Sequence, residues 1–237
     1  DFLKLYKKFC PGPITFILKK KKESQIVSLV SAKLDTVAIR FPSHKIIRSI
    51  LKNIDFPLAM PSANISSSIS PVSAEDVADE FKKDIKFILN GGKSKVGIES
   101  TVVDLTGEPT ILRPGIISPK IISKVLKVNI VKKNTKIKSP GMLRKHYSPG
   151  IPIFLNQEAA NDTNALITFG KKYKFKKNYF NLSKKSNLKE AASNLYKTLR
   201  KIKKLKFKKI YVTKIPNFGA GIAINDRLKR AAKKKWN

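Results

Sequence analysis

The stretch LAMPSAN, residues 58–64, organises the rest of this chain. Its first three residues are apolar and predict a short strand, which Pro61 ends because proline has no amide hydrogen for a strand ladder. The residues that follow, as far as Pro71, are rich in serine and carry no charge. We therefore expect a polar loop at a strand end, where open α/β sheets bind ligands and where hydroxyls and amides can hold phosphate or carboxylate oxygens. A plain Ser-rich turn would have the same composition.

Short strands alternate with helices on both sides of this loop. Apolar periodicity and turn residues predict strands over residues 14–18, 36–40, 87–89, 102–105 and 110–113, with a two-residue turn at 107–108. Amphipathic patterns and capping residues predict helices over 1–8, 44–54, 73–81 and 118–127. This arrangement is typical of a mixed-sheet α/β domain, which we place at residues 1–138.

The C-terminal third has a simpler alternation. It predicts strands over residues 152–155, 165–169 and 210–213 and helices over 188–205 and 220–235, which indicates a small Rossmann-like α/β domain over 151–237. No G-x-G-x-x-G follows its first strand, so we expect no dinucleotide site. The segment SPGMLRKHYSPG, residues 139–150, has the composition of a linker. Its basic and aromatic residues predict a lid.

Composition narrows the class of protein. A hydrophobic content of 41% is typical of a globular chain, and no apolar run is long enough to cross a bilayer. The single cysteine, Cys10, excludes an internal disulfide framework and, with two histidines, argues against a metal site made of protein side chains. We expect a cytoplasmic protein without a membrane partner.

The net charge of +34 has two interpretations. A nucleic-acid surface would be basic, whereas a compositional bias toward Lys, Ile and Asn would spread lysine along the chain without a motif. The lysines lie singly or in short runs and are not interleaved with aromatics, which favours the bias. Only seven basic residues are arginine, the usual fork for phosphate or carboxylate, so these are the more informative positions.

Seven motifs follow one another along the chain. They are PGPITFIL (11–18), VAIRFPSH (37–44), PSANISSSISP (61–71), GIESTVVDLT (97–106), ILRPG (111–115), SPGMLRKHYSPG (139–150) and GAGIAINDRLKRAA (219–232). As an ordered set they resemble the two-domain threonylcarbamoyl-AMP synthases, with a YrdC-like twisted mixed-sheet domain and a second Rossmann-like domain. The chain opens inside a predicted helix without an initiator Met, so we expect an N-terminal truncation that removes a family segment with a Lys-x-Arg pair.

The resemblance implies a nucleotidyltransferase that joins L-threonine, bicarbonate and ATP into threonylcarbamoyl-AMP and pyrophosphate. That product serves the threonylcarbamoyladenosine modification of tRNA, through a downstream tRNA threonylcarbamoyl transferase complex. Mg²⁺ is expected with ATP, held mainly by phosphates and water. Such a reaction requires the protein mainly to position anionic substrates and to stabilise developing charge. The uncharged Ser-rich loop and the arginines are suited to both tasks.

The resemblance also implies roles for individual residues. Ser62 and Asn64 would be catalytic and would contact ATP. Further ATP contacts would come from Thr36, Ser70, Arg113, His146 and Tyr147. Threonine would be held by Arg40, Met60 and Ser100, and we expect no protein metal ligand.

Two rival functions remain. A module that binds tRNA or double-stranded RNA, inactive as given, would explain the charge, and its affinity would fall steeply as salt rises. A carbamoyl-phosphate-using maturation factor shares the YrdC-like domain, but it would need zinc-finger cysteines that a chain with one Cys lacks.

Overall fold

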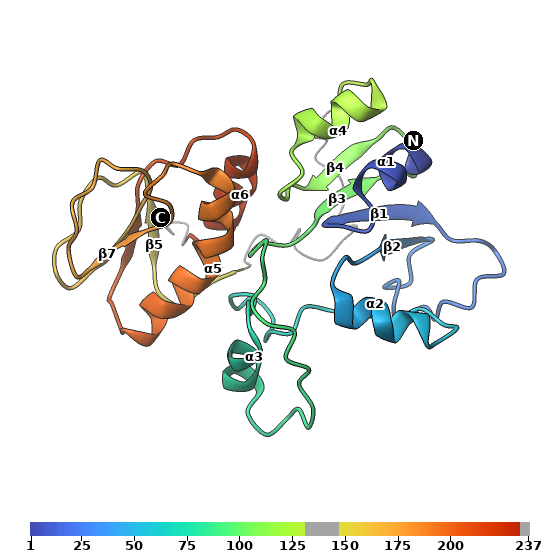
Figure 1. The fold of residues 1–237 in the computed structure, drawn as a ribbon, viewed down its shortest axis with the longest axis horizontal. Coiled ribbons are helices and arrows are strands. Elements are labelled where there is room, and N and C mark those ends of the chain that lie inside the picture. The colour runs from blue at the N-terminus through green and yellow to red at the C-terminus, as the bar shows by residue number, and fades with distance from the viewer. Residues whose placement is uncertain (131–146, 233–237) are drawn as a thin grey trace. The chain divides into compact units, whose positions relative to one another are not determined.

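The computed structural model describes residues 1–130 and 147–232, which form two compact units. The first unit consists of Asp1–Pro61 and the described part of Glu99–Met142. It contains α1 (Phe2–Phe9), β1 (Ile14–Lys19), β2 (Thr36–Arg40), α2 (Lys45–Lys52), β3 (Thr101–Asp104), β4 (Thr110–Arg113) and α4 (Pro119–Leu126) (Figure 1).

The strands of the first unit form a mixed sheet in the order β2-β1-β3-β4. β1 is antiparallel to β2 and parallel to β3, and β3 and β4 form the predicted antiparallel hairpin. The hairpin loop is longer than the predicted turn, because Asp104 pairs with Thr110 and its carboxylate accepts hydrogen bonds from the amide and hydroxyl of Thr106. The mixed sheet confirms the fold predicted for this half.

The main core of the first unit lies between the sheet and α1 and α4. It contains Leu5 of α1, Ile122 and Leu126 of α4 and inward residues of β1, β3 and β4 (Figure 1). Alternation along β1 places Ile14 and Phe16 in this core and therefore points Thr15 and Ile17 to the opposite face of the sheet. That opposite face carries Thr15 beside a smaller buried apolar cluster of Ile17, Val102 and Leu112.

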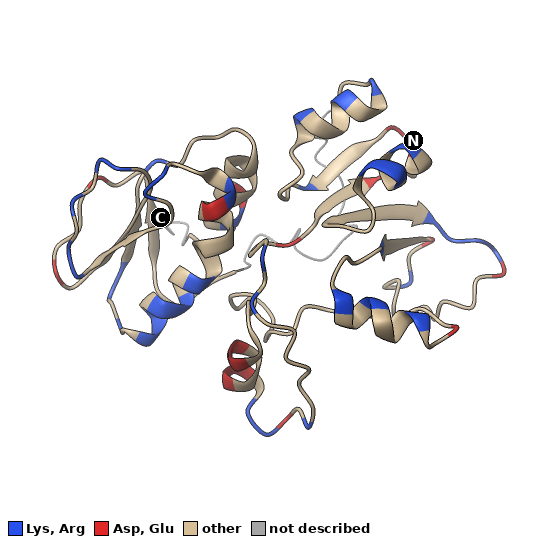
Figure 2. Ribbon diagram, in the orientation of Figure 1, with Lys and Arg blue, Asp and Glu red and all other residues tan. Residues whose placement is uncertain are grey.

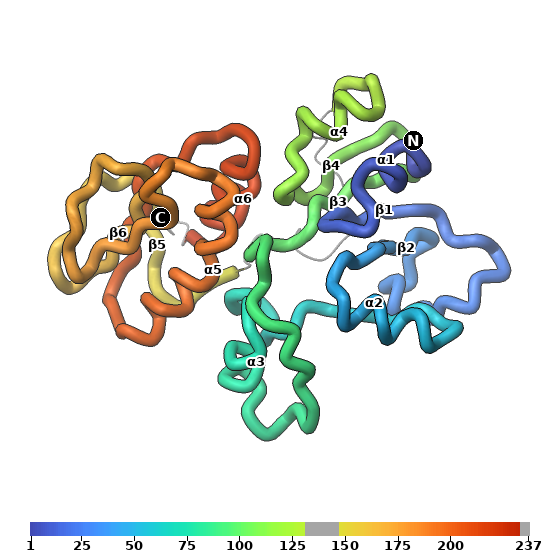
Figure 3. The backbone as a smooth tube through the Cα atoms, viewed as in Figure 1, coloured from blue at the N-terminus to red at the C-terminus, as the bar shows by residue number. Residues whose placement is uncertain are grey.

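The second unit consists of Ser62–Ile98 and the described part of Leu143–Asn237. It contains α3 (Ala74–Phe81), β5 (Ile153–Leu155), β6 (Ala165–Thr168), β7 (Tyr179–Asn181), α5 (Leu188–Lys204), β8 (Ile210–Val212) and α6 (Ala220–Ala231). The strands form a parallel sheet in the order β5-β8-β6-β7, which confirms the Rossmann-like prediction. Figure 3 follows the chain through α3 and the long loop after it.

Two predicted strands are absent from the described residues. Residues 58–60 are irregular and Met60 is 66% exposed, because Pro57 and Pro61 bracket the segment and neither can donate to a ladder. Residues 87–89 are also irregular, and the side chains of Phe87 and Leu89 are exposed. These apolar residues find no neighbouring strand, so composition alone misidentified them.

Helix α3 begins as the sequence predicts, at Ser73. The Ser73 hydroxyl accepts a hydrogen bond from the Asp76 amide at 3.3 Å, while the Asp76 carboxylate accepts from the amide of Val72 at 2.9 Å. Figure 2 shows that acidic residues gather on α3, whereas Lys and Arg are spread over both units. This helix is therefore an acidic element in a basic chain, which favours its contacts with the basic side chains of α5.

The predicted domain boundaries at 138 and 151 stay a prediction. The described residues group differently along the chain, because residues 62–98 belong to the same compact unit as the Rossmann-like sheet. The predicted lid, residues 139–150, falls mostly outside the described residues.

Candidate functional site

A row of paired residues, polar except for Val102, crosses the sheet of the first unit. Arg40 pairs with Thr15, Thr15 is beside Val102, and Val102 pairs with Arg113. A register shift at Val102 and Val103 makes Arg113, the last residue of β4, the partner of Val102. The row thus places two arginines at the ends of β2 and β4.

Ser100 ties this row together. Its hydroxyl is 2.7 Å from the Thr15 hydroxyl and accepts a hydrogen bond from Arg113 Nη2 at 3.2 Å. Arg113 Nε also donates to the Ser100 carbonyl at 3.2 Å. Ser100 is only 4% exposed, so these hydrogen bonds are shielded from water. The bonds orient both the hydroxyl and the guanidinium.

The electrostatics of the row favour an anion. Desolvation by burial, and secondarily the charge of Arg113, lowers the pKa of Arg40 from its usual value. Two guanidinium groups near one another repel, and a carboxylate or phosphate between them would relieve that repulsion. The row can therefore hold an anionic group by a fork and neutral hydroxyls.

Thr36 and Met60 occupy other positions in the first unit. Thr36 pairs with Lys19 at the opposite end of β2 from Arg40. Side-chain alternation puts it on the same face as Arg40, four positions earlier in the strand and about 13 Å away. Met60 lies in the irregular segment after α2, with its side chain exposed.

The Ser-rich loop belongs to the second unit. Ser62 is exposed, Asn64 is half-buried and Ser70 is 8% exposed. The Asn64 side-chain amide donates to the carbonyls of Ile65, at 2.8 Å, and Ser68, at 3.4 Å. Both partners are carbonyl oxygens, which suit the nitrogen end of the amide.

The oxygen of the Asn64 side chain has a different environment. Asn64 Oδ1 is shielded from solvent and has no hydrogen-bond partner among the described residues. It is an acceptor, suited to a hydroxyl or amine, whereas the predicted phosphate contact needs a donor. The phosphate contact of Asn64 stays a prediction.

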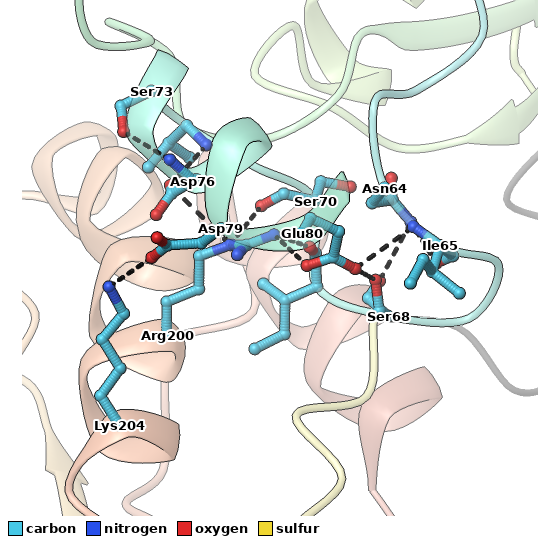
Figure 4. A network of polar contacts seen from close by, with 12 residues as sticks. Asn64, Ile65, Ser68, Ser70, Ser73, Asp76, Asp79, Glu80, Arg200 and Lys204 are labelled. Atoms are coloured by element: carbon cyan, nitrogen blue, oxygen red, sulfur yellow. Dashed lines mark hydrogen bonds and ion pairs between the residues drawn. The ribbon is translucent and has the colours of Figure 1, made fainter. Parts of the chain in front are cut away.

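Partly buried ionic contacts anchor this loop to α3 and α5. Glu80 accepts hydrogen bonds from the Ser68 hydroxyl and, at 3.2 Å, from the Ile65 amide (Figure 4). Arg200 of α5 donates to Glu80 at 3.2 Å and to the Ile69 carbonyl at 2.6 Å. One carboxylate and one guanidinium therefore hold both the loop's backbone and its serine.

Glu80 is ionised in this setting. Burial alone would raise its pKa, but hydrogen bonds from Ser68 and Ile65, together with the charge and hydrogen bond of Arg200, lower it overall. The anchor is thus a charged pair at neutral pH.

Of the predicted His146–Tyr147 pair, His146 lies outside the described residues. The Tyr147 ring is 1% exposed and stacks on Tyr196 of α5, with ring centres 5.6 Å apart. The Arg227 guanidinium lies 5.3 Å from the centre of the same ring. Next to it, the Ser148 amide donates to the Ser67 carbonyl of the Ser-rich loop at 2.9 Å. Tyr147 is held within the second unit, and its contact with ATP stays a prediction.

Sequence reasoning missed Thr15, Glu80 and Arg200. Thr15 and Glu80 look like ordinary strand and helix residues. Arg200 carried a signal, since it is the one arginine in a helix whose other basic residues are all lysine. In a chain with so few arginines, such a choice indicates a need for a fork rather than for charge alone.

The described residues offer no evident metal cluster or membrane span. No group of three or more His, Cys, Asp or Glu side chains lies together in residues 1–130 and 147–232. Within the same ranges, no helix has the length and apolar character needed to span a bilayer.

Comparisons with known proteins agree with this architecture. A Sua5–YciO–YrdC domain model, described as telomere recombination, matches residues 1–115, and a model described as threonylcarbamoyl-AMP synthase, C-terminal domain, matches 117–233. The threonylcarbamoyl-AMP synthase of Pyrococcus abyssi is 33% identical over 96% of this chain and 72% of its own length. The Bacillus subtilis threonylcarbamoyl-AMP synthase is also 33% identical, with the same coverage.

Solved structures are similar over the same extent. The crystal structure of Pyrococcus abyssi Sua5 complexed with L-threonine matches with a TM-score of 0.85 and 32% identity, over 98% of this chain and 73% of that one. A variant of that protein, with an adjacent histidine and tyrosine replaced by alanine, matches with a TM-score of 0.83 and 31% identity, over 97% of this chain and 72% of that one. With two domain models in the expected order and relatives similar over most of their length, the chain belongs to the threonylcarbamoyl-AMP synthase family.

Proposed function

We propose that this chain is an enzyme, a nucleotidyltransferase, that makes threonylcarbamoyl-AMP from L-threonine, bicarbonate and ATP. The observation that carries the proposal is the row Arg40–Thr15–Ser100–Arg113, which suits the carboxylate of an amino acid. Family membership supplies the reaction, and the relative solved with L-threonine supports an amino-acid substrate. The product serves tRNA modification in the cytoplasm, where a downstream complex transfers the threonylcarbamoyl group to tRNA.

The reaction divides into two steps. The threonine amine adds to bicarbonate, with loss of water, and gives a carbamate. A carbamate oxygen then attacks the α-phosphorus of ATP, the bond to the β-phosphate oxygen breaks, and pyrophosphate leaves with the bonding electrons. Both steps join anions, so the protein contributes mainly by orientation and by donors aimed at developing charge.

Arg40, Met60 and Ser100 are the proposed contacts for threonine. The hydrogen bonds of Arg113 to Ser100 support a second role for Arg113, which would orient the threonine site besides reaching ATP phosphates. Arg40 is the better candidate for a bidentate grip on the carboxylate, since it ends its strand on the open face.

The proposed ATP contacts come from the Ser-rich loop and its neighbours. Ser62 is exposed and can turn its hydroxyl to a phosphate oxygen. Asn64 and Ser70 belong to the same loop, Thr36 belongs to the open face of β2, and His146 and Tyr147 belong to the proposed lid, residues 139–150. We propose that Mg²⁺ enters with ATP and keeps phosphate and water ligands, a coordination common for this ion.

The test is pyrophosphate release that depends on ATP, threonine and bicarbonate together. Ser62→Ala should slow it by about 100- to 1000-fold, the loss typical of one preorganised donor, without changing the free energy of unfolding. Ser66→Ala is the matched control, because Ser66 is an exposed serine of the same loop that is not a predicted ligand. Equal turnover in both variants would refute the role of Ser62, and no three-substrate dependence in the wild type would refute the function.

A further inference from the structure

One face of α5 contacts segments that precede the Rossmann-like sheet in sequence. Ser193, Tyr196, Arg200 and Lys204 follow one another at helical spacing, so they lie on a single side of the helix. The side next to it carries Ala192, Leu195, Leu199 and Ile202, which are buried, and Tyr196 at the boundary between the two sides is buried as well. The helix therefore joins two layers, and the first four residues define its outer contacts.

Each of these four residues contacts a segment outside the Rossmann-like sheet. Gly97 lies against Ser193 so closely that a Cβ on Gly97 would be 2.5 Å from the Ser193 Cα. Tyr196 stacks on Tyr147. Lys204 donates to Asp79 of α3 at 2.6 Å.

Arg200 makes the most extensive contacts of the four. Its guanidinium donates to the carbonyls of Ile69 and Ser70, at 2.6 and 3.5 Å, and to Glu80 at 3.2 Å (Figure 4). Its Nε is also 3.8 Å from the Asp76 carboxylate. The side chains are secluded, with exposed fractions of 12% for Arg200, 10% for Glu80 and 16% for Asp76.

The chemistry of this cluster requires a fork. A planar guanidinium can serve backbone carbonyls and a carboxylate at once, whereas an ammonium group on a flexible stem cannot match that set of directions. Ion pairs removed from water are stable only where geometry and hydrogen bonds are well satisfied, so the cluster fixes the relative positions of its members. Those members include the backbone of the Ser-rich loop.

We propose that Arg200 is a positioning residue for adenylate formation. From its place in the C-terminal domain, Arg200 holds the loop of residues 62–71 in the conformation that binds ATP. The role of the loop in binding ATP rests on the proposed function, whereas the anchoring of the loop by Arg200 does not. Through Ile69 and Ser70 the guanidinium limits the loop's backbone, and through Glu80 it orders Ser68 and Ile65. On this view the C-terminal domain is part of the catalytic apparatus through Arg200.

The experiment compares Arg200→Lys with wild type in the full chain. Lysine keeps the positive charge, so the protein should still fold, but the loop loses the guanidinium that donates to its carbonyls. We expect kcat/KM for ATP to fall by about 10- to 100-fold, the scale of a misplacement of about 1 Å, with the dissociation constant for threonine unchanged. Hydrogen exchange of the peptide covering residues 65–71 should become faster.

Lys204→Met is the matched control. It lies one turn further on the same helix and pairs with the same α3, but its ion pair is exposed, so it should change neither measurement. Arg200→Met with Glu80→Gln provides a second test, since it removes both charges of the pair and avoids leaving the Glu80 carboxylate buried without its counter-charge. It should reproduce the ATP defect of Arg200→Lys.

The outcomes separate the two proposals. Wild-type ATP kinetics or unchanged loop exchange in Arg200→Lys would overturn the positioning role, as would an equal loss of threonine and ATP binding. If the wild type releases no pyrophosphate but Arg200→Lys loosens residues 65–71, the function fails while the anchor stands.

Discussion

Gly97 offers a direct test of how tightly the segment before β3 packs on α5. Its backbone has φ of +74°, and an alanine methyl there would meet Ser193 Cα and O, both at 2.5 Å. Left-handed backbone costs a non-glycine residue about 1–2 kcal/mol. Overpacking against helix backbone, which cannot move aside, adds about 1–3 kcal/mol. Gly97→Ala should therefore lower the free energy of unfolding by about 2–5 kcal/mol.

Gly92→Ala is the control for the backbone term. Gly92 has φ of +78°, and a methyl group there would have nothing within 4 Å, so its substitution carries the conformational cost alone. The gain from restricting the unfolded chain is common to both variants and cancels in the comparison. Urea denaturation should show Gly97→Ala less stable than Gly92→Ala by about 1–3 kcal/mol. Equal losses would mean that residue 97 does not press on α5, and would remove one of the four contacts assigned to that face.

Two further predictions concern charge. Arg40→Lys should recover only part of the threonine affinity that Arg40→Ala loses, because lysine keeps the charge without the fork; titration calorimetry with threonine measures this, and full recovery would contradict a bidentate contact. For Glu80, whose folded pKa lies below its usual value, the stabilisation is present above the unfolded pKa and is lost as pH falls through the folded pKa. The stability difference between wild type and Glu80→Gln should therefore shrink on acidification from about pH 6 to pH 3, and a difference independent of pH would show that the Glu80 charge contributes nothing.

The position of α5 suggests why a small parallel-sheet domain follows the mixed-sheet domain. Its buried side completes the Rossmann-like core, and its outer side carries the residues that hold the Ser-rich loop. Acidic α3 faces basic α5 through Glu80 and Asp79, so the complementary charges of these two helices have a structural use (Figure 2). A change at Arg200 or Glu80 would reach the loop without touching a proposed substrate contact.

Local sequence patterns determined much of this molecule. The strand over residues 36–40 and the cap at Ser73 each depend on a few neighbouring residues, and each formed where the pattern predicts it. The β3–β4 hairpin also formed, although its loop is longer than the predicted turn. The arginines at the ends of β2 and β4 could be singled out because strand ends and forks have a direct chemical meaning. The family resemblance added the order of motifs, which no single motif carries.

Tertiary structure alone decided the remaining features. Residues 58–60 have strand composition but no strand neighbour, and β7 forms from a segment that was not predicted because β6 lies beside it. The register shift that aims Arg113, the stacking of Tyr147 on Tyr196 and the grip of Arg200 on a loop about 130 residues earlier all join distant segments. Periodicity reports which side of an element is apolar, but it does not say which partner that side will meet; that choice is made only when the whole chain packs.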